Sequence, residues 1–299
     1  EKAVELLEPL GIDVTVWDEE KIQEEGLEAF YAVARGSVRP PRFIIMEYKG
    51  DPSTEARTAL VGKGMTYDSG GYSIKSTAGM LTMNGDMGGA GTVIGTLHAL
   101  ATLKAKINVV AVIAAAENMI SGSSYKPGDI IGSLSGKTIE ITNTDAEGRV
   151  TLADAMWYAT DVLGADRVID LATLTGACVV ALGDDYTGAL TNDQALMDAV
   201  LEASKEAGEN IWQMPGDGAF AGKNKSKVAD LANSGERGGG MMSAGEFVGA
   251  FVAKDTPWVH LDIAGSAWVG APRNYLHHGA TGIHVRTLTL LLGDLTCDH

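Results

Sequence analysis

The sequence contains little cysteine and no long hydrophobic run. Only 2 of its 299 residues are cysteines, Cys178 and Cys297, so a framework of disulfide bonds is excluded, and the apolar surroundings of Cys178 are typical of a buried thiol. The longest apolar run, residues 107–116, is about half the ~20 residues that a membrane-spanning helix needs. The first residues also lack the basic-then-apolar pattern of a signal peptide. These absences predict a cytoplasmic protein without a membrane anchor.

Basic residues are also scarce. Lys and Arg total 23 against 39 Asp and Glu, which gives a net charge of −16. Such a charge repels phosphate backbones, and no basic stripe offsets it, so nucleic acid is an unfavourable partner. A hydrophobic content of 45% indicates a globular chain rather than a disordered one. The length fits two domains, or one α/β unit of ~250 residues with an extension, and both remain open.

The first 30 residues show helical periodicity in an acidic background. Gly36 and the pair Pro40-Pro41 then interrupt the chain before the first strand-like run. We therefore place a boundary near residue 38. Residues 1–38 are predicted to be a linker helix and the remnant of an N-terminal region, and residues 39–299 to form one domain. Because the chain begins at Glu1 and not at Met, we expect that a segment preceded it.

Strand-like and helix-like segments alternate from residue 42 onward, and several of the strands are apolar throughout. The predicted strands are residues 42–48, 58–64, 107–118, 137–143, 167–174 and 258–265. The predicted helices are residues 87–104, 149–163 and 193–207. Strands without polar alternation are expected where helices cover both faces of a sheet. The pattern predicts an α/β fold with three α/β/α layers and a mixed, mostly parallel central sheet.

Acidic residues gather at the predicted strand ends and helix starts. Lys63 and Asp68 follow one apolar run, Asp86 opens a predicted helix, and Asp145 and Glu147 follow another run. Ligands of open α/β sheets bind beyond the carboxyl ends of the strands. Like charges gathered at this edge are tolerable when cations lie between them. The sequence therefore predicts a metal site.

Structural interpretations of the same residues remain open. Thr144–Glu147 fits a T-x-x-E capping box, and Asp86 is an ordinary acid at a helix start. Asp68 in the sequence YDSGG could be a turn aspartate that accepts a hydrogen bond from its own backbone. Lys63 and Lys75, taken singly, are typical of solvated surface lysines.

Motifs for other chemistries are missing. Gly62-Lys63-Gly64 lacks the hydroxyl residue of a phosphate-binding loop, and no G-x-G-x-x-G, H-E-x-x-H or G-x-S-x-G motif is present. We expect His277 and His278 to lie in a loop near the last strand rather than on a metal. Nucleotide binding, zincin chemistry and serine catalysis therefore have little support.

The octapeptide NTDAEGRV, residues 143–150, resembles the signature of the leucyl aminopeptidase family (cytosol aminopeptidases), with Val in place of the usual final Leu. Further blocks resemble family segments in the same order, namely residues 61–75, 83–93, 117–130, 172–177 and 260–268. The resemblance covers residues from about 40 to the end. It implies that the family's N-terminal domain is missing and that the first 38 residues are the connecting helix.

The resemblance implies two adjacent divalent metal ions in each chain. Asp68 and Glu147 would bridge both ions, Lys63 and Asp86 would complete the tighter site, and Asp145 the exchangeable one. A site without thiolates or imidazoles suits manganese or zinc, with magnesium or cobalt as further options. A lysine ligates only as the neutral amine, so the ion must lower the pKa of Lys63 strongly.

The resemblance also implies the catalytic roles. Lys75 would donate hydrogen bonds to the developing oxyanion, and Arg149 would hold a bicarbonate that acts as general base. Glu117 is the alternative base, although we interpret it as structural. The pocket for the first side chain of the substrate would be lined by small or apolar residues and by one backbone carbonyl. These substrate-binding residues are Met83, Thr173, Leu174 (through its carbonyl), Gly176, Ala264 and Ala267.

The sequence thus predicts a metallo-aminopeptidase that uses metal-activated water. Its substrates would be peptides with a free N-terminus, with a preference for Leu and a broad range. The resemblance also implies a homohexamer. Two alternatives remain, a dipeptidase of narrow specificity and a protein that keeps the fold for a non-peptidase binding role such as DNA binding. The intact set of ligands and the charge of −16 argue against the second.

Overall fold

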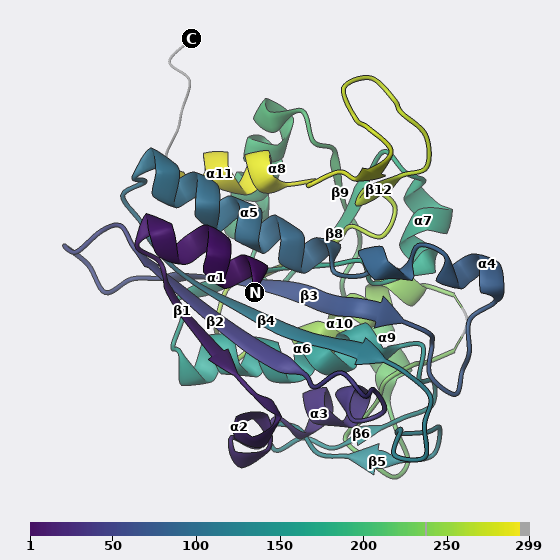
Figure 1. The fold of residues 1–299 in the computed structure, drawn as a ribbon. Coiled ribbons are helices and arrows are strands. Elements are labelled where there is room, and N and C mark those ends of the chain that lie inside the picture. The colour runs from purple at the N-terminus through teal and green to yellow at the C-terminus, as the bar shows by residue number, and fades with distance from the viewer. Residues whose placement is uncertain (237, 294–299) are drawn as a thin grey trace.

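A mixed eight-stranded sheet forms the centre of the computed structural model, which describes residues 1–236 and 238–293 (Figure 1). The strand order is β1-β2-β4-β3-β7-β11-β8-β9. The strands are β1 (Asp13–Trp17), β2 (Arg42–Lys49), β3 (Thr58–Asp68), β4 (Asn108–Asn118), β7 (Arg167–Ala172), β8 (Thr187–Thr191), β9 (Ile211–Gln213) and β11 (Trp258–Asp262). Parallel pairings join β4-β3-β7-β11 and β8-β9, and the other three pairings are antiparallel. The predicted mixed, mostly parallel sheet is confirmed.

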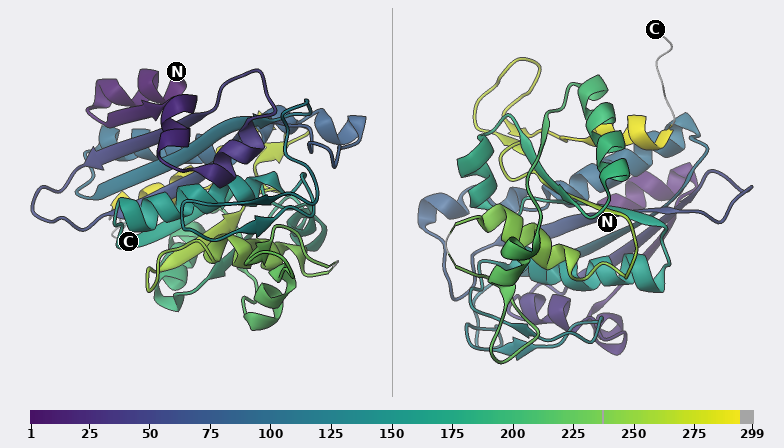
Figure 2. Two further views of the ribbon diagram at one scale, coloured as in Figure 1. Left: turned by 90° about the horizontal axis from the view of Figure 1, so that it is seen from below. Right: turned by 180° about the vertical axis from the view of Figure 1, so that it is seen from behind.

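Helices cover both faces of this sheet, which gives the predicted three layers (Figures 1 and 2). One face carries α1 (Lys2–Leu7), α5 (Gly88–Leu103), α8 (Gln194–Ala207) and α11 (Val285–Gly293). The other face carries α3 (Glu28–Ala34), α6 (Glu147–Trp157) and α10 (Gly240–Gly249). Each helical layer packs against the sheet through its own cluster of buried apolar side chains. Strands covered on both faces must be apolar throughout, and β3 and β4 show this pattern.

Shorter elements complete the described part of the chain. The remaining helices are α2 (Glu19–Glu24), α4 (Thr77–Met80), α7 (Gly176–Leu182) and α9 (Gly218–Ala221), with 3-10 turns at Glu8–Leu10, Met83–Gly85 and Gly222–Asn224 and a π-helical turn at Tyr158–Val162. A small sheet has the order β10 (Leu231–Ala232), β6 (Ile139–Glu140) and β5 (Ile130–Ile131). A second small sheet pairs β12 (Trp268–Val269) with β13 (Gly279–Ala280).

Helix α5 lies unusually close to the sheet. A Cβ atom on Gly89 would lie 2.0 Å from the carbonyl oxygen of Leu171 on β7, so only glycine permits this approach. The first turn of α5 therefore rests directly on β3 and β7. This contact fixes the segment before the helix, which contains Asp86, beside the carboxyl end of β3.

Two secondary-structure expectations are wrong. The helical pattern expected over residues 1–30 is interrupted by β1, whose β-branched, alternating sequence DVTVW pairs with β2. The strand expected over residues 137–143 is reduced to Ile139–Glu140. It pairs with β5 and β10 in the small sheet, because the chain leaves the central sheet after β4.

Residues 1–38 contribute to the same sheet and core as the rest of the chain. Strand β1 extends the central sheet, and Phe30 of α3 is fully buried in the cluster that includes α6 residues. The domain boundary near residue 38 stays a prediction.

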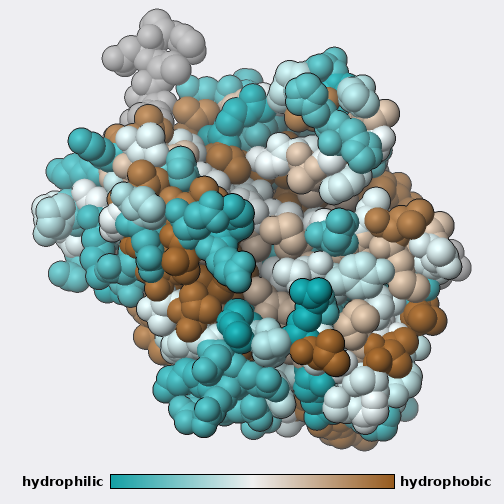
Figure 3. Space-filling model, in the orientation of Figure 1, coloured by the Kyte–Doolittle hydropathy of each residue, from teal (hydrophilic) through white to brown (hydrophobic). Residues whose placement is uncertain are grey.

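Cys178 is fully buried, as expected, and Cys297 lies outside the described residues. No helix among the described residues combines the length and apolar character needed to cross a bilayer. Hydrophilic side chains cover much of the face shown in Figure 3, with smaller hydrophobic groups between them.

Candidate metal centre

The predicted metal ligands lie at the edge of the sheet where its parallel strands end. Lys63 and Asp68 belong to the last part of β3, and Glu147 begins α6. Asp86 and Asp145 each lie two residues before a helix, α5 and α6 respectively, next to its N-cap residue. Parallel strands direct their carboxyl ends to one edge, so residues separated by some 80 positions meet there.

Lys63 is buried among carboxylates, with a relative exposure of 3%. Its Nζ atom lies 2.9 Å from both carboxylate oxygens of Asp86 and 2.8 Å from Oε1 of Glu147, and it donates to the carbonyl oxygen of Thr173 at 3.0 Å. The space for this side chain depends on Gly148. A Cβ atom there would lie 2.4 Å from Cε and 2.6 Å from Nζ of Lys63.

Asp68 is held from three directions. Its Oδ1 atom accepts hydrogen bonds from the backbone N–H of Gly70 and from Nδ2 of Asn118, both at 2.8 Å. Its Oδ2 atom lies 2.8 Å from Nζ of Lys75, which also pairs with Asp145. Asn118 ends β4 and donates in addition to the carbonyl oxygen of Thr144, so it connects two segments of the site.

The carboxylates of Asp68, Asp86 and Glu147 are buried and converge. Each offers an oxygen, and these oxygens lie within 4.8 Å of one another. Within the described part of the chain, Oε2 of Glu147 is buried without a hydrogen-bond partner. A buried carboxylate oxygen left without a partner is costly unless a cation or another donor satisfies it. The set of donors therefore fits a divalent cation.

The pKa shifts show how burial and neighbouring charges act on the ionisable groups of this site when no metal is bound. Burial raises the pKa of Asp86 and of Glu147, and the negative charge of Asp68 adds to both shifts. Burial acts to lower the pKa of Lys63, but the charges of Asp86, Glu147 and Asp68 outweigh it and raise that pKa above its ordinary value. In the chain alone this shift favours the ammonium form of Lys63, so a metal ion that uses Lys63 as a ligand must displace a proton.

Most of the structural interpretations of these residues are wrong. Ala146 is the N-cap of α6 and makes no side-chain cap, while the hydroxyl of Thr144 donates to the carbonyl oxygen of Gly70, so no capping box forms. Asp86 does not cap α5. The expectation of a turn aspartate is correct for Asp68, whose Oδ1 accepts from Gly70 while Oδ2 faces Lys75. Neither lysine is a solvated surface residue.

A cleft of about 550 Å³ connects these residues to the surface. Twelve of the thirteen predicted site residues line it, including all five predicted metal ligands, Lys75 and the six residues predicted to bind substrate. The exception is Arg149. It is buried in α6 and donates from Nη1 to the carbonyl oxygen of Asn233 at 2.9 Å, while its Nε lacks a partner among the described residues. Burial lowers the pKa of Arg149 to about 10.

Several functional candidates carry no signal in the sequence. Asn118 follows an apolar run, as Asp68 does, but an amide in a strand does not by itself indicate that it orients a ligand. Trp268 and Asp184 also line the cleft, although their segments are distant in sequence from the acidic motifs. Glu117 points elsewhere and binds Ser37 and Arg39, which agrees with its structural interpretation. His278 packs edge-on against Trp268 and lies in the loop between β12 and β13.

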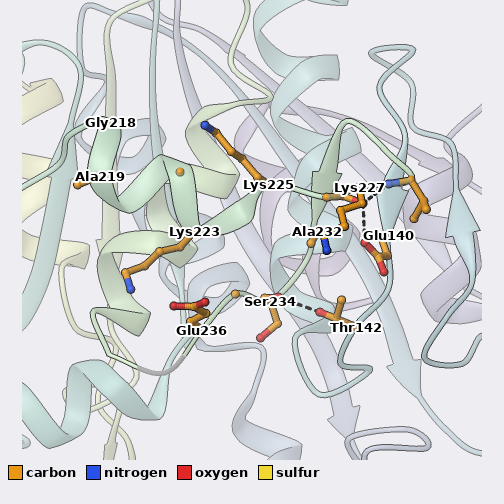
Figure 4. Close-up of a pocket in the computed structure, with 14 residues that line it drawn as sticks. Glu140, Thr142, Gly218, Ala219, Lys223, Lys225, Lys227, Ala232, Ser234 and Glu236 are labelled. Carbon is orange, nitrogen blue, oxygen red and sulfur yellow. Dashed lines mark hydrogen bonds between the residues drawn. The ribbon is translucent and has the colours of Figure 1, made fainter.

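A second cavity, of about 940 Å³, lies between the small sheet and the segment that contains α9 (Figure 4). Lys223, Lys225 and Lys227 border it together with Glu140 and Glu236. None of the thirteen predicted site residues lines this cavity. Size therefore does not mark the chemical centre, whereas the buried carboxylates do.

Comparisons with known proteins agree with this geometry. Residues 1–289 match the family model described as "Cytosol aminopeptidase family, catalytic domain". The chain is 56% identical to a probable cytosol aminopeptidase of Treponema denticola and 55% identical to one of Clostridium tetani, over 97% and 95% of its own length. It spans about three fifths of these relatives, 61% and 59% of their lengths.

A solved structure gives the same result. The bottromycin maturation enzyme BotP in complex with Mn is 40% identical, with a TM-score of 0.94 over 98% of this chain and 65% of that one. On this evidence the chain belongs to the cytosol aminopeptidase family and contains the family's catalytic domain.

Proposed function

We propose that this chain is a metal-dependent aminopeptidase that releases N-terminal residues from peptides, prefers Leu and accepts a broad range of first residues. The observation that carries this proposal is the cleft in which five potential ligands, Lys75 and an uncharged pocket meet. Family membership supports the reaction class.

Two divalent ions would be held by Lys63, Asp68, Asp86, Asp145 and Glu147. The convergence of three buried carboxylates and the unpartnered Oε2 of Glu147 support this assignment. Bound ions of this kind supply Lewis acidity, which polarises a carbonyl group and lowers the pKa of water. Manganese is the first candidate because a structural relative is described in complex with it, and zinc is the second.

Lys75 would stabilise the oxygen on which negative charge develops. Its pKa is raised: burial acts to lower it, but Asp68 and Asp145 outweigh that effect, so the ammonium form persists at neutral pH. An ammonium group has three N–H donors, and the two carboxylates engage two of them. The third can donate to a substrate oxygen in the cleft. Because two ion pairs hold Lys75, little reorganisation is needed during the reaction.

Arg149 would hold a bicarbonate ion, which supplies a general base. Its guanidinium remains charged at neutral pH despite burial, and its Nε, which has no partner among the described residues, offers a donor. Arg149 itself then has a positioning role, and its hydrogen bond to the carbonyl oxygen of Asn233 fixes the guanidinium.

The first side chain of the substrate would occupy the part of the cleft bordered by Met83, Thr173, Gly176, Ala264 and Ala267, and the carbonyl of Leu174 would accept from the substrate amine. An uncharged pocket of this kind favours Leu and Met. It discriminates weakly, because one methylene group changes selection by only ~1 to 3 kcal/mol. We further propose that the protein is cytoplasmic and assembles as a homohexamer.

The test compares a free and a blocked substrate. Purified chain loaded with Mn²⁺ should hydrolyse Leu-amide but not N-acetyl-Leu-amide, should bind two ions per chain by elemental analysis, and should lose activity on chelation. Equal hydrolysis of both amides would refute the exopeptidase assignment. Hydrolysis that persists after complete removal of metal would refute the metal-dependent reaction.

A further inference from the structure

The residues that line the cleft fall into two chemically different groups. One group is the buried lysine and carboxylates of the candidate metal centre with Lys75. The other group consists of uncharged residues such as Met83, Val179 and Trp268, with one exception. Among the described residues that line the cleft, Asp184 is the one charged residue outside the metal centre and Lys75.

Asp184 is fixed to the wall of the predicted pocket. It follows α7 and is exposed. A Cβ atom on Gly265 would lie 2.1 Å from the carbonyl oxygen of Gly183 and 3.5 Å from Cα of Asp184. The backbone at residues 183–184 therefore packs against the segment that contains Ala264 and Ala267.

Asp184 also lacks a counterion within the described part of the chain, whereas its neighbour does not. Asp185 pairs with Nη1 of Arg273 at 2.7 Å, and it does not line the cleft. The two adjacent aspartates thus differ in surroundings, although each carries the same charge. An unpaired carboxylate among otherwise uncharged lining residues attracts a cation on a ligand that binds in the cleft.

We propose that Asp184 selects substrates whose first residue is basic, Lys above all. This inference rests on the proposed aminopeptidase function and on the assignment of the pocket to the first side chain. The aliphatic stem of Lys can lie along Met83 and Trp268 while its ammonium group pairs with Asp184. The chain then accepts two classes of first residue. Apolar side chains pack against the uncharged lining residues, and basic side chains make the same contacts and also pair with Asp184.

The experiment uses a substrate pair that differs only in the charged group. Lys-amide and norleucine-amide share the straight stem, so the ratio of their kcat/KM values isolates the ammonium group. We expect Asp184→Asn to lower this ratio about 2- to 5-fold, the range for an ion pair that remains partly solvated. Asp185→Asn removes the same charge one residue away, outside the cleft, and should leave the ratio unchanged. Asp184→Glu should largely restore it.

Ionic strength gives a second readout, which a structural defect would not produce. Raising salt from ~20 mM to ~0.5 M should lower the ratio for the unmodified chain and leave that of Asp184→Asn almost flat. If norleucine-amide is hydrolysed but Asp184→Asn and Asp185→Asn change the ratio equally, the inference is wrong while the proposed function stands. If the metal-loaded chain hydrolyses neither amide, the proposed function fails and the inference fails with it.

Discussion

Gly148→Ala tests how the helix start of α6 shapes the metal centre. Ordinary contacts of a Cβ atom begin near 3.4 Å, but the new methyl group would lie 2.4 Å from Cε and 2.6 Å from Nζ of Lys63. The side chain of Lys63 must therefore move by about 1 Å, although contacts with Asp86, Glu147 and Thr173 hold its tip. Such overpacking costs about 1–3 kcal/mol.

Helix propensity acts in the opposite direction. Replacing Gly by Ala within a helix stabilises it by about 1 kcal/mol, so the net loss of folding stability should be about 0–2 kcal/mol. A displaced Lys63 could no longer place its amine where the proposed metal ligation requires it. Since about 1.4 kcal/mol corresponds to a factor of ten in an equilibrium constant, we expect the affinity for the first metal ion to fall at least about tenfold.

Calorimetric titration with Mn²⁺ and urea unfolding of the same samples measure the two quantities separately. Gly91→Ala is the matched control, because this exposed glycine of α5 has only Met87 near its Cβ position, at 3.8 Å. That variant should keep full metal affinity. If Gly148→Ala binds two ions as tightly as the unmodified chain, the close approach to Lys63 does not shape the site and the reasoning is refuted.

Three further outcomes follow from the structure. Asp68→Ala should abolish activity and reduce the metal content, and two ions per chain by elemental analysis would contradict its role as a bridging ligand. Lys75→Ala should retain both ions but lower kcat by about 100-fold or more, and an unchanged kcat would contradict the oxyanion role. Asp154 has a pKa raised by burial to about 7, although it accepts from the backbone N–H groups of Phe30 and Leu134. Its folded pKa exceeds the unfolded one, so its contribution to the free energy of unfolding falls as pH rises from about 4 to 7. In urea titrations, Asp154→Asn should lower stability and flatten this slope, and an identical slope in both proteins would refute the pKa assignment.

The fold class could be predicted because its signals are local. Long apolar runs such as β3 and β4 indicate strands that are covered on both faces, and the intervening periodic segments indicate helices. The sequence pattern did not predict strand β1, because five alternating residues between acidic helical segments give only a weak strand signal. The segment at 137–143 reads as a strand locally, but its short pairing with β5 and β10 depends on distant partners.

The residues of the candidate site were also predictable, but their arrangement was not. The motif around Asp145 and Glu147 indicated the kinds of side chain proposed as ligands, and the family resemblance supplied the remaining predicted positions. Nothing in the motif indicates why Gly148 must lack a side chain, since the reason is the position of Lys63 on another element. Likewise, Asn118 gains its meaning only by lying 2.8 Å from Asp68 across neighbouring strands.

By itself, the sequence determined the layers of the fold, the family and the kinds of side chain available for chemistry, because hydrophobic periodicity and motif identity are properties of neighbouring residues. Only the tertiary structure decided that twelve of the predicted residues line one cleft while Arg149 is buried and does not line it. It also decided that Asp184 lines that cleft without a counterion among the described residues, while Asp185 pairs with Arg273. Charge pairing and burial depend on distances between segments far apart in the chain, and chain folding alone sets those distances.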